Sequence, residues 1–245
     1  MSSSSSQSGA ISSQADVQQM FDTIVPRYDL MNHVMTFGMD FFWRRRMAKI
    51  ARMTETGPSD FVVDVACGTG DVAFAIEAVG VPLVTGLDYS SGMIAEAQKK
   101  AKKRRSEVNF LEGDAMAMPF RDGIASAATI SFGMRNLPDY AAGVREMTRI
   151  VRPGGRVICL EATPYDHPVL KHPFNFYFHR VLPLIGKLLT GEYEAYKYLP
   201  ESVRHFPKPD ELAEIFREAG LVDVQVTMLG FGSVALHIGT VPIES

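Results

Sequence analysis

Apolar runs of strand length alternate with helix-like segments from Phe61 onward. The strand-like runs are apolar almost throughout, which is typical of strands that are buried on both faces. The pattern therefore predicts an α/β domain with a mostly parallel sheet and helices on both faces. Expected strands occupy residues 61–66, 82–88, 108–114, 124–132 and 156–162, and expected helices occupy residues 70–80, 90–105 and 139–151.

The C-terminal part of the pattern is different. A helix-like segment at residues 209–220 precedes two strand-like runs, 221–229 and 233–241, which only Gly230-Phe231-Gly232 separates. Two strands joined by so short a loop form a hairpin, so we expect the last strand to run antiparallel to the others. Upstream, the sequence RPGG at 152–155 is expected to end a helix before the fifth strand.

Three segments lie outside this alternation. The Ser-rich residues 1–14 lack the apolar core of a signal peptide and are expected to be a disordered tail. Residues 15–57 are predicted to form a helical lid before the first strand. The main domain then covers residues 58–245 and carries an aromatic-rich insertion at 163–207.

Composition narrows the class of protein. The chain has 245 residues, 46% of them hydrophobic, and a net charge of -3, which gives no general reason to expect nucleic-acid binding. Cys67 and Cys159 have no second Cys or His at ligand spacing, so we expect no disulfide framework and no metal, and a reducing cytoplasm fits best. No run approaches the ~18 apolar residues of a membrane span.

The segment FVVDVACGTGDVA (61–73) joins a buried strand to a glycine turn that opens a helix. Ligands of open parallel sheets bind beyond the carboxyl ends of the strands, where Gly68 and Gly70 would let the backbone approach closely. Gly68, Gly70 and Ala73 also satisfy the loose dinucleotide fingerprint, and Asp88 follows at a suitable distance to hold a ribose. The turn alone thus indicates either a dinucleotide or S-adenosyl-L-methionine.

The charges beside the turn favour S-adenosyl-L-methionine. Asp71 directly follows Gly70, so a pyrophosphate bound there would face a carboxylate at close range. S-adenosyl-L-methionine instead carries an ammonium, which Asp64 or Asp71 would attract, and a cationic sulfonium. The chain also lacks the second nucleotide-binding half that a dinucleotide needs.

Carboxylates end successive strand-like runs. Asp88 ends the second and Asp114 ends the third, and with the Asp64–Asp71 region they would form an acidic rim at one edge of the sheet. The simpler alternative is that the glycines only make a tight turn, that Asp71 caps a helix and that Asp88 is a solvated loop residue. The clustering of carboxylates at one edge argues against this alternative.

Several segments resemble known methyltransferase motifs. VVDVACGTGD, GLDYSSGMIAEA, EGDAMAMPF, ISFGMRN and RIVRPGGRV are similar to the successive motifs of class I S-adenosylmethionine-dependent methyltransferases. Residues 21–45, 130–137 and 198–207 resemble the ubiquinone/menaquinone biosynthesis C-methyltransferase family more specifically. The resemblance runs from about Met20 to about Gly239. It implies a Rossmann-like class I methyltransferase fold with a seven-stranded, mostly parallel sheet and an antiparallel last strand.

The resemblance also implies the cofactor, S-adenosyl-L-methionine, and a role for several residues. Thr69 would face the cofactor, Asp88 would hold its ribose, Asp114 and the backbone of Ala115 would contact the adenine, and Ser131 would line the pocket. The implied reaction is C-methylation of a demethylated polyprenyl quinol, either demethylmenaquinol or the benzoquinol of the ubiquinone pathway. At residues 230–232 the sequence departs from the Thr-Gly-Gly-like turn of similar proteins. The resemblance therefore specifies the reaction more closely than it specifies which quinone is methylated.

Methyl transfer to a ring carbon needs an electron-rich carbon, which ionisation of a neighbouring phenol (pKa about 10) provides. Arg135, just past the fourth strand, is a poor base but a good stabiliser of a phenolate. Tyr28, Asp29 and Asn32 are candidates to orient the phenol or a water that takes its proton. In the simpler interpretation Arg135 only pairs with a surface carboxylate and Tyr28 anchors the lid.

Two histidines are further candidate bases because they titrate near neutrality. His205 lies in the 198–207 motif, whereas His237 alternates with apolar residues in a strand and is better explained as structural.

The insertion at 163–207 is the candidate substrate lobe. Its aromatic residues, interleaved with cations such as Lys171 and Arg180, fit a channel or surface patch for an isoprenoid tail, with peripheral contact to anionic lipid at the inner face of the membrane. Ordinary packing would explain many of them. The basic run KKAKKRR (99–105) is interpreted as a solvated helix end. We expect no nucleic-acid partner, and a homodimer is left open.

Three other functions stay open on the sequence alone. The acceptor could be another lipid or small phenol, the protein could be a nicotinamide-dependent oxidoreductase, or it could be a binding protein that keeps the fold without activity.

Overall fold

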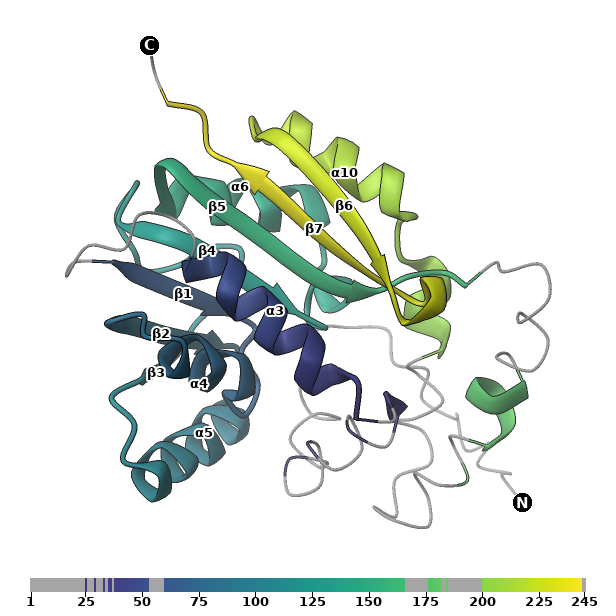
Figure 1. Ribbon diagram of the computed structural model, residues 1–245, viewed down its shortest axis with the longest axis horizontal. Coiled ribbons are helices and arrows are strands. Elements are labelled where there is room, and N and C mark those ends of the chain that lie inside the picture. The colour runs from purple at the N-terminus through teal and green to yellow at the C-terminus, as the bar shows by residue number, and fades with distance from the viewer. Residues whose placement is uncertain are drawn as a thin grey trace, which may run out of the picture.

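The computed structural model describes residues 25, 29, 33, 35, 36, 38–52, 60–165, 176–181, 184 and 200–243. The described residues form a seven-stranded sheet in the order β3-β2-β1-β4-β5-β7-β6 (Figure 1). The pairs β3–β2, β2–β1, β1–β4 and β4–β5 are parallel, and β7 runs antiparallel to both β5 and β6. The strands are β1 (Phe61–Val65), β2 (Leu83–Asp88), β3 (Asn109–Glu112), β4 (Ala125–Ser131), β5 (Val151–Ala162), β6 (Val222–Leu229) and β7 (Val234–Thr240). The predicted fold class, including the reversed last strand, is confirmed.

Helices cover both faces of the sheet, as the continuous apolar strands require. They are α3 (Asp40–Arg52), α4 (Asp71–Ala78), α5 (Ser91–Arg104), α6 (Tyr140–Ile150) and α10 (Pro209–Glu218). Shorter helical segments are η2 (Met134–Asn136), η3 (Tyr177–Val181) and η4 (Gly230–Gly232). The helix starts follow local chemistry: Ser90 accepts a hydrogen bond from the Met93 amide (3.1 Å) at the start of α5, and Asp139 accepts one from the Ala142 amide (2.9 Å) at the start of α6.

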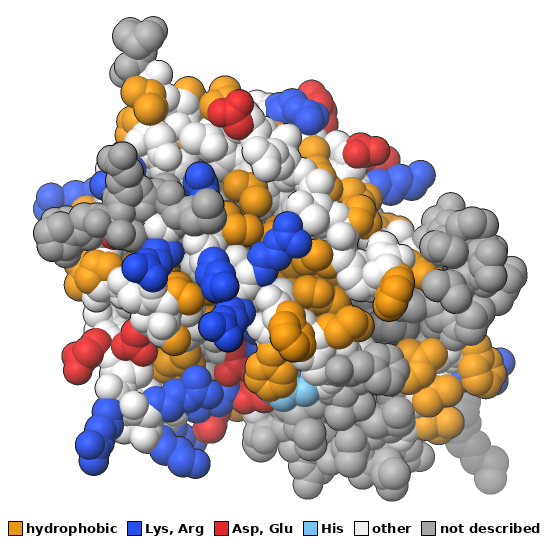
Figure 2. Space-filling model, in the orientation of Figure 1, with side chains coloured by type: hydrophobic (Ala, Val, Ile, Leu, Met, Phe, Trp, Pro, Cys, Tyr) orange, Lys and Arg blue, Asp and Glu red, His pale blue; other side chains and the backbone are white. Residues whose placement is uncertain are grey.

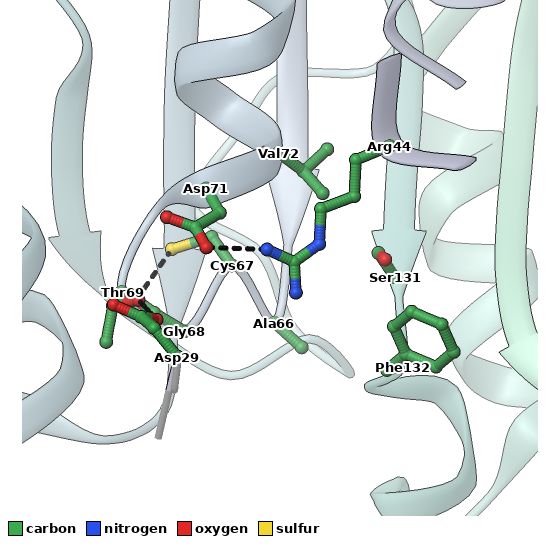
Figure 3. Close-up of a pocket in the computed structure, with 10 residues that line it drawn as sticks. All are labelled: Asp29, Arg44, Ala66, Cys67, Gly68, Thr69, Asp71, Val72, Ser131 and Phe132. Carbon is green, nitrogen blue, oxygen red and sulfur yellow. Dashed lines mark hydrogen bonds and ion pairs between the residues drawn. The ribbon is translucent and has the colours of Figure 1, made fainter. Parts of the chain in front are cut away.

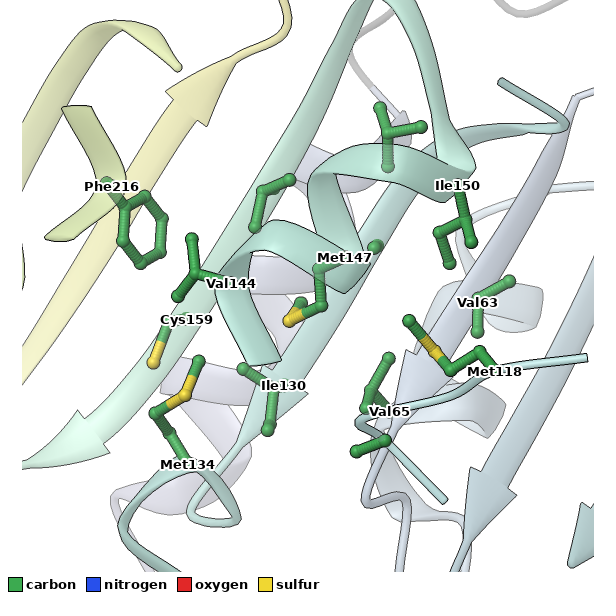
Figure 4. Packing of buried hydrophobic residues seen from close by; sticks show 14 of the residues in the cluster. Val63, Val65, Met118, Ile130, Met134, Val144, Met147, Ile150, Cys159 and Phe216 are labelled. Carbon is green, nitrogen blue, oxygen red and sulfur yellow. The ribbon is translucent and has the colours of Figure 1, made fainter. Parts of the chain in front are cut away.

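Two hydrophobic clusters hold the layers together. On one face, α6 and α10 direct Met147 and Phe216, among others, toward β-strand residues such as Val63 and Ile130 (Figure 4). On the other face, α3 and α4 bury residues including Trp43 against β1, β4 and β5. Burial of large apolar side chains on both faces supplies the main driving force for this architecture.

One strand boundary was predicted wrongly. The strand expected at 156–162 begins at Val151, which already pairs with Ala125, so the RPGG sequence lies inside β5. The pairing then jumps to Ala127 opposite Arg156, so the chain between Val151 and Arg156 bulges. Gly155 fits there because a Cβ atom would lie 2.6 Å from the Ser126 carbonyl oxygen. The glycines therefore shape a bulge in the strand rather than a loop before it.

The predicted domain divisions are only partly covered. Residues 1–14 lie outside the described residues, and so does most of the predicted lid except α3 and a few positions before it. Of the insertion at 163–207, the structure describes residues 163–165, 176–181, 184 and 200–207. The lid and the substrate lobe as such stay predictions. No helix among the described residues is both long and apolar enough to cross a membrane.

Candidate functional site

The glycine turn connects β1 to α4 at the carboxyl edge of the sheet. Gly68 and Gly70 have φ angles of 55° and 89°, a region that favours glycine. A Cβ atom on Gly70 would also lie 2.6 Å from the ring of Phe110. The turn therefore requires glycine at position 70 both for its backbone and for its contact with β3.

Asp88 ties this turn to the next loop of the same edge. Its Oδ2 accepts a hydrogen bond from the Gly68 amide (2.7 Å), and its Oδ1 accepts one from the Ser90 amide (2.9 Å). Asp114 lies beyond β3, and its Oδ1 accepts a hydrogen bond from the Met116 amide (2.8 Å). The side chain of Ala115 is buried in the core, 7% exposed. The structure thus brings the predicted strand-end residues to neighbouring strands of one edge.

The sequence predicted an acidic rim, but the rim is not purely acidic, because two cations enter it. Figure 3 shows Arg44 of α3 reaching Asp71 at the start of α4, with 2.5 Å between Nη1 and Oδ2. Lys100 of α5 lies 3.2 Å from the other oxygen of Asp71. Burial opposes ionisation of Asp71, but the charges of Arg44 and Lys100 outweigh it and lower the pKa of this carboxyl. Asp71 makes no side-chain cap of its own helix.

Lys100 also joins Asp29 to the turn. Thr69 donates its hydroxyl to Asp29 Oδ1 (2.5 Å), while the Lys100 ammonium contacts Thr69 Oγ1 (2.8 Å) and pairs with Asp29. The interpretation of residues 99–105 as a solvated helix end is therefore wrong for Lys100, which is 17% exposed. It lies one and two helical turns from the buried Ala97 and Met93, and three acceptor side chains hold it inward.

Asp64 lies in the sheet beneath this network. It is 1% exposed, and its Oδ1 accepts a hydrogen bond from the Thr129 hydroxyl (2.8 Å). Its Oδ2 is buried and has no hydrogen-bond partner in the part of the chain that the structure describes. Burial raises the pKa of Asp64 to about 7, against the hydrogen bond from Thr129 and the charge of Arg44. Asp64 is thus a carboxyl poised to change charge near neutral pH.

A cavity lies between the turn and the end of β4. The hollow measures about 330 Å³ when the adjoining open solvent is counted with it, and it is lined by Asp29, Arg44, Ala66, Cys67, Gly68, Thr69, Asp71, Val72, Ser131 and Phe132. In Figure 3, Arg44 lies between Asp71 on one side and Ser131 and Phe132 on the other.

Two walls of this cavity have uncommon backbone conformations. Ala66 and Phe132 have φ angles of 50° and 56°, in the left-handed region that L-residues seldom adopt. The Ser131 hydroxyl is buried and has no hydrogen-bond partner among the described residues. Strained backbone persists only where the surrounding structure imposes it, and it is concentrated at binding and active sites. A buried polar atom without a partner at the same cavity also calls for a functional explanation.

Arg135 occupies the next loop, in η2 beyond β4. Its Nη1 lies 3.0 Å from Glu161 Oε1, at the end of β5, and also donates to the Phe132 carbonyl. The side chains of Arg135 and Glu161 are 7% and 0% exposed. Arg135 therefore belongs to a buried ion pair rather than to a pair with a surface carboxylate. It does not line the cavity, although Phe132, to which it is bonded, does.

The other candidate bases are placed as follows. His237 is buried, its Nε2 lies 2.8 Å from the Pro209 carbonyl oxygen, and burial lowers its pKa, so it is structural. His205 is exposed, with Nδ1 2.9 Å from the Glu201 carbonyl oxygen. Tyr28 and Asn32 lie outside the described residues. Within the described ranges, no three His, Cys, Asp or Glu residues are grouped to hold a metal ion.

The sequence analysis did not identify three charged residues of this region as members of the site. Arg44 shares a helix face with the buried Met47 and Ala51, and Glu161 sits in the apolar run of β5. Lys100 lies on the buried side of α5. The available signal was a charge at an inward position of an amphipathic pattern, since such a charge needs an internal partner.

The arrangement fits a small zwitterion beside a nucleoside. The amino-acid end of S-adenosyl-L-methionine carries an ammonium and a carboxylate. The carboxylates Asp29 and Asp71 and the cation Arg44 line the cavity, and Lys100 pairs with both carboxylates from outside the lining. The buried Ser131 hydroxyl supplies a further polar group without a partner among the described residues. A pyrophosphate would meet Asp71 at the start of α4, where a phosphate-binding loop has none of this negative charge.

Comparison with known proteins gives one matching family model and several similar enzymes. The model of the ubiE/COQ5 methyltransferase family matches residues 9–241. The chain is 44% identical over 225 residues to the demethylmenaquinone methyltransferase of Thermus thermophilus, covering 91% of this chain and 100% of that protein. It is 40% identical over 230 residues to the enzyme of the same name from Lactiplantibacillus plantarum, covering 92% and 95%.

Solved structures agree on the fold. A Thermotoga maritima protein described as a SAM-dependent methyltransferase, possible histamine N-methyltransferase, superposes with a TM-score of 0.61 at 19% identity, covering 91% of this chain and 98% of that one. Phosphoethanolamine N-methyltransferase 2 of Haemonchus contortus, in complex with S-adenosyl-L-methionine, gives 0.68 at 16% identity, covering 96% and 61%. The predicted class I fold is thereby confirmed.

Proposed function

We propose that this chain, which belongs to the ubiE/COQ5 methyltransferase family, transfers a methyl group from S-adenosyl-L-methionine to a ring carbon of demethylmenaquinol. The observation that carries the proposal is 44% identity, over the whole length of the relative, to a demethylmenaquinone methyltransferase. The second relative described above carries the same name. This favours a naphthoquinol over a benzoquinol, a choice that the sequence motifs had left open.

The cofactor would be held by the glycine turn and the strand ends around it. Asp88 would accept hydrogen bonds from the ribose while it continues to fix the Gly68 amide, and Asp114 with the Ala115 backbone would contact the adenine. The methionyl ammonium would be attracted by Asp71 and Asp64, and the carboxylate by Arg44 and Lys100. When bound, the cofactor supplies an activated methyl group.

The acceptor would be activated by the lid and by the loop after β4. A phenol ionises with a pKa near ~10, so a nearby cation that stabilises the phenolate makes the ring carbon electron-rich. We assign that role to Arg135, which Glu161 and the Phe132 carbonyl hold in a fixed orientation. Tyr28, Asp29 and Asn32 would orient the hydroxyl or a water that accepts its proton. Asp29, the member of this set that the structure describes, lies at the cavity.

The chain would work in the cytoplasm, at the inner face of the membrane, because its proposed acceptor carries a polyprenyl tail that partitions into lipid. The aromatic insertion at 163–207 would receive that tail. A homodimer stays a prediction with no observation in its favour.

A two-substrate assay tests the reaction. The chain is incubated with methyl-labelled S-adenosyl-L-methionine and, separately, with demethylmenaquinol and the demethylated benzoquinol of the ubiquinone pathway. We expect label in the naphthoquinol ring, at a rate well above that for the benzoquinol. Equal labelling would leave the acceptor as a quinol of either kind, and labelling of neither would refute the proposed reaction. Calorimetry with NAD is the control, since tight NAD binding without S-adenosyl-L-methionine binding would favour an oxidoreductase instead.

A further inference from the structure

The outward face of α3 has a composition that the core does not explain. Its inward face buries Trp43, Met47, Ala48 and Ala51 against the sheet and α4. At the N-terminal end of the outward face, Phe41 and Phe42 are 59% and 77% exposed. The rest of that face consists of four exposed cations, Arg45, Arg46, Lys49 and Arg52.

Stability of the folded chain gives no reason for this arrangement. Two adjacent phenylalanines keep most of their apolar surface in water, and their burial would be favourable. Arg45 and Lys49 are four residues apart and Lys49 and Arg52 three apart, spacings at which like charges on a helix repel. Within the described ranges, none of the four cations has a carboxylate at ion-pair distance, in contrast to Arg44 on the inward face. The face has the features of a contact surface.

This face adjoins the proposed active site. Phe41 and Phe42 directly precede Trp43, whose ring is 6.5 Å from that of Phe132 in the cavity wall. Phe41 stacks on His33 with 4.2 Å between ring centroids and is still 59% exposed. Figure 2 shows hydrophobic and cationic side chains side by side on the face of the molecule where α3 lies. A surface bound there would lie close to the cavity wall that Phe132 forms.

We propose that the outward face of α3 docks on an anionic lipid bilayer, with Phe41 and Phe42 inserted among the headgroups and Arg45, Arg46, Lys49 and Arg52 against their phosphates. Aromatic rings beside a row of cations match an anionic membrane interface in both charge and polarity. The net charge of the chain is -3, so attraction to the bilayer depends on this local cluster. The inference rests on the proposed function, because a polyprenyl quinol is delivered by the bilayer and would enter the site from it.

Vesicle co-sedimentation of the full chain tests the docking. Vesicles of phosphatidylglycerol and phosphatidylcholine are compared with vesicles of phosphatidylcholine alone, at low and high salt. We expect binding to the anionic vesicles that weakens as salt rises. The variant Arg45→Gln/Lys49→Gln should bind about thirtyfold more weakly, from the loss of two cations near the surface. The variant Phe41→Ser/Phe42→Ser should bind at least tenfold more weakly.

Two matched controls separate this face from general charge and hydrophobicity. Lys102→Gln/Lys103→Gln removes the same charge from the exposed end of α5, and Ile243→Ser removes a side chain that is 76% exposed elsewhere. Both should bind like the unmodified chain. Equal loss in the α5 variant, no loss in the α3 variants, or equal binding to both kinds of vesicle would overturn the proposal. Self-association without lipid that the phenylalanine variant abolishes would overturn it too, with a second copy as the occupant.

Turnover distinguishes docking from the reaction itself. On a water-soluble, short-tailed demethylnaphthoquinol the α3 variants should match the unmodified chain, which also shows that they are folded. On a long-tailed quinol in anionic vesicles their turnover should fall at least tenfold. Binding to anionic vesicles through α3 with no methylation of any quinol would refute the proposed function and leave the docking intact.

Discussion

Three carboxylates of this region each meet a hydrogen-bond donor from another part of the chain. Asp71 meets Arg44 and Lys100, Asp88 meets two backbone amides, and Glu161 meets Arg135. Crowded negative groups would otherwise repel, and a buried charge without a partner is costly. Individual substitutions therefore act through the partner that they leave behind as well as through the group that they remove.

Asp88→Ala is expected to weaken cofactor binding by about 10- to 100-fold. The change removes the proposed acceptor for the ribose hydroxyls together with the acceptor that fixes the Gly68 and Ser90 amides of the turn. Hydrogen bonds to a charged group contribute roughly 1.5–3 kcal/mol. Calorimetric titration with S-adenosyl-L-methionine measures the affinity. Glu112→Ala is the matched control, since Glu112 is the exposed register partner of Asp88 on β3 and should leave the affinity unchanged. An unaltered affinity in Asp88→Ala would contradict the assignment.

Arg135→Ala is expected to lower the free energy of unfolding by about 3–5 kcal/mol, because it leaves the buried Glu161 without a cation, held, among the described residues, only by the backbone amides of residues 135 and 162. The double variant Arg135→Met/Glu161→Leu should recover most of that loss, since no buried charge remains. Urea denaturation measures both. A double variant as unstable as the single one would show that the ion pair is not the cause.

Catalysis by Arg135 is tested with the milder change Arg135→Lys, which keeps a cation for Glu161. We expect turnover to fall more than cofactor affinity, because the proposed contact of Arg135 is with the developing phenolate. Equal losses in turnover and in affinity would argue for a purely structural role.

At the scale of elements, the site is shaped where strands and helices join. β1 enters α4 through a left-handed glycine, and β4 enters η2 through Phe132, also left-handed. Gly133 follows, and a Cβ atom on it would lie 2.6 Å from the Cβ of Ala66. The loops after β1 and β4 are thus packed against each other, which fixes the width of the cavity between them.

Gly70→Ala is expected to destabilise the chain more than Gly220→Ala. Both glycines have φ of 89°, but a Cβ on Gly70 meets Phe110 at 2.6 Å, whereas one on Gly220 meets nothing within 4 Å. Gly220→Ala should therefore show only the backbone cost, roughly 1–2 kcal/mol. Denaturant midpoints measure the difference, which reports the steric contact. If the two variants lose equal stability, the contact with Phe110 does not constrain the turn.

At the scale of the whole molecule, the buried Asp64 links folding to pH. Its pKa is raised from 3.8 to about 7, so between these pH values the folded chain holds a proton that the unfolded chain releases. The contribution of Asp64 to the free energy of unfolding therefore falls as pH rises from about 4 to about 7, and then levels off. At about 1.4 kcal/mol per pKa unit, the fall is on the order of 4 kcal/mol.

Asp64→Asn isolates this contribution. The asparagine cannot ionise, so the variant does not share the loss of stability that ionisation of Asp64 causes. Its free energy of unfolding, relative to that of the unmodified chain, should rise between pH 4 and pH 7 and stay constant above pH 7. Comparison of the two proteins cancels the opposite trend of His237, whose lowered pKa makes stability increase with pH near neutrality. Urea titrations at several pH values measure the difference, and a gap that does not change with pH would contradict the buried, proton-holding state.

Much of this architecture follows from local patterns. The alternation of apolar strands with amphipathic helices predicted the layers and the parallel sheet, and the short Gly230–Gly232 connection predicted the antiparallel β7. The start of β5 was missed because Pro and Gly within RPGG signal a loop, whereas β4 provides a pairing partner for Val151 that no local pattern reveals.

The sequence by itself determined the fold class, the glycine turn and the carboxylates that end successive strands, because these depend on periodicity and on residues adjacent in the chain. Only the tertiary structure decided how those charges are balanced. Arg44, Lys100 and Glu161 come from α3, α5 and β5, and they meet Asp71, Asp29 and Arg135 across long stretches of chain. Pairing between such distant side chains depends on how helices pack on the sheet, and the burial that makes the pairing necessary exists only once the chain has folded.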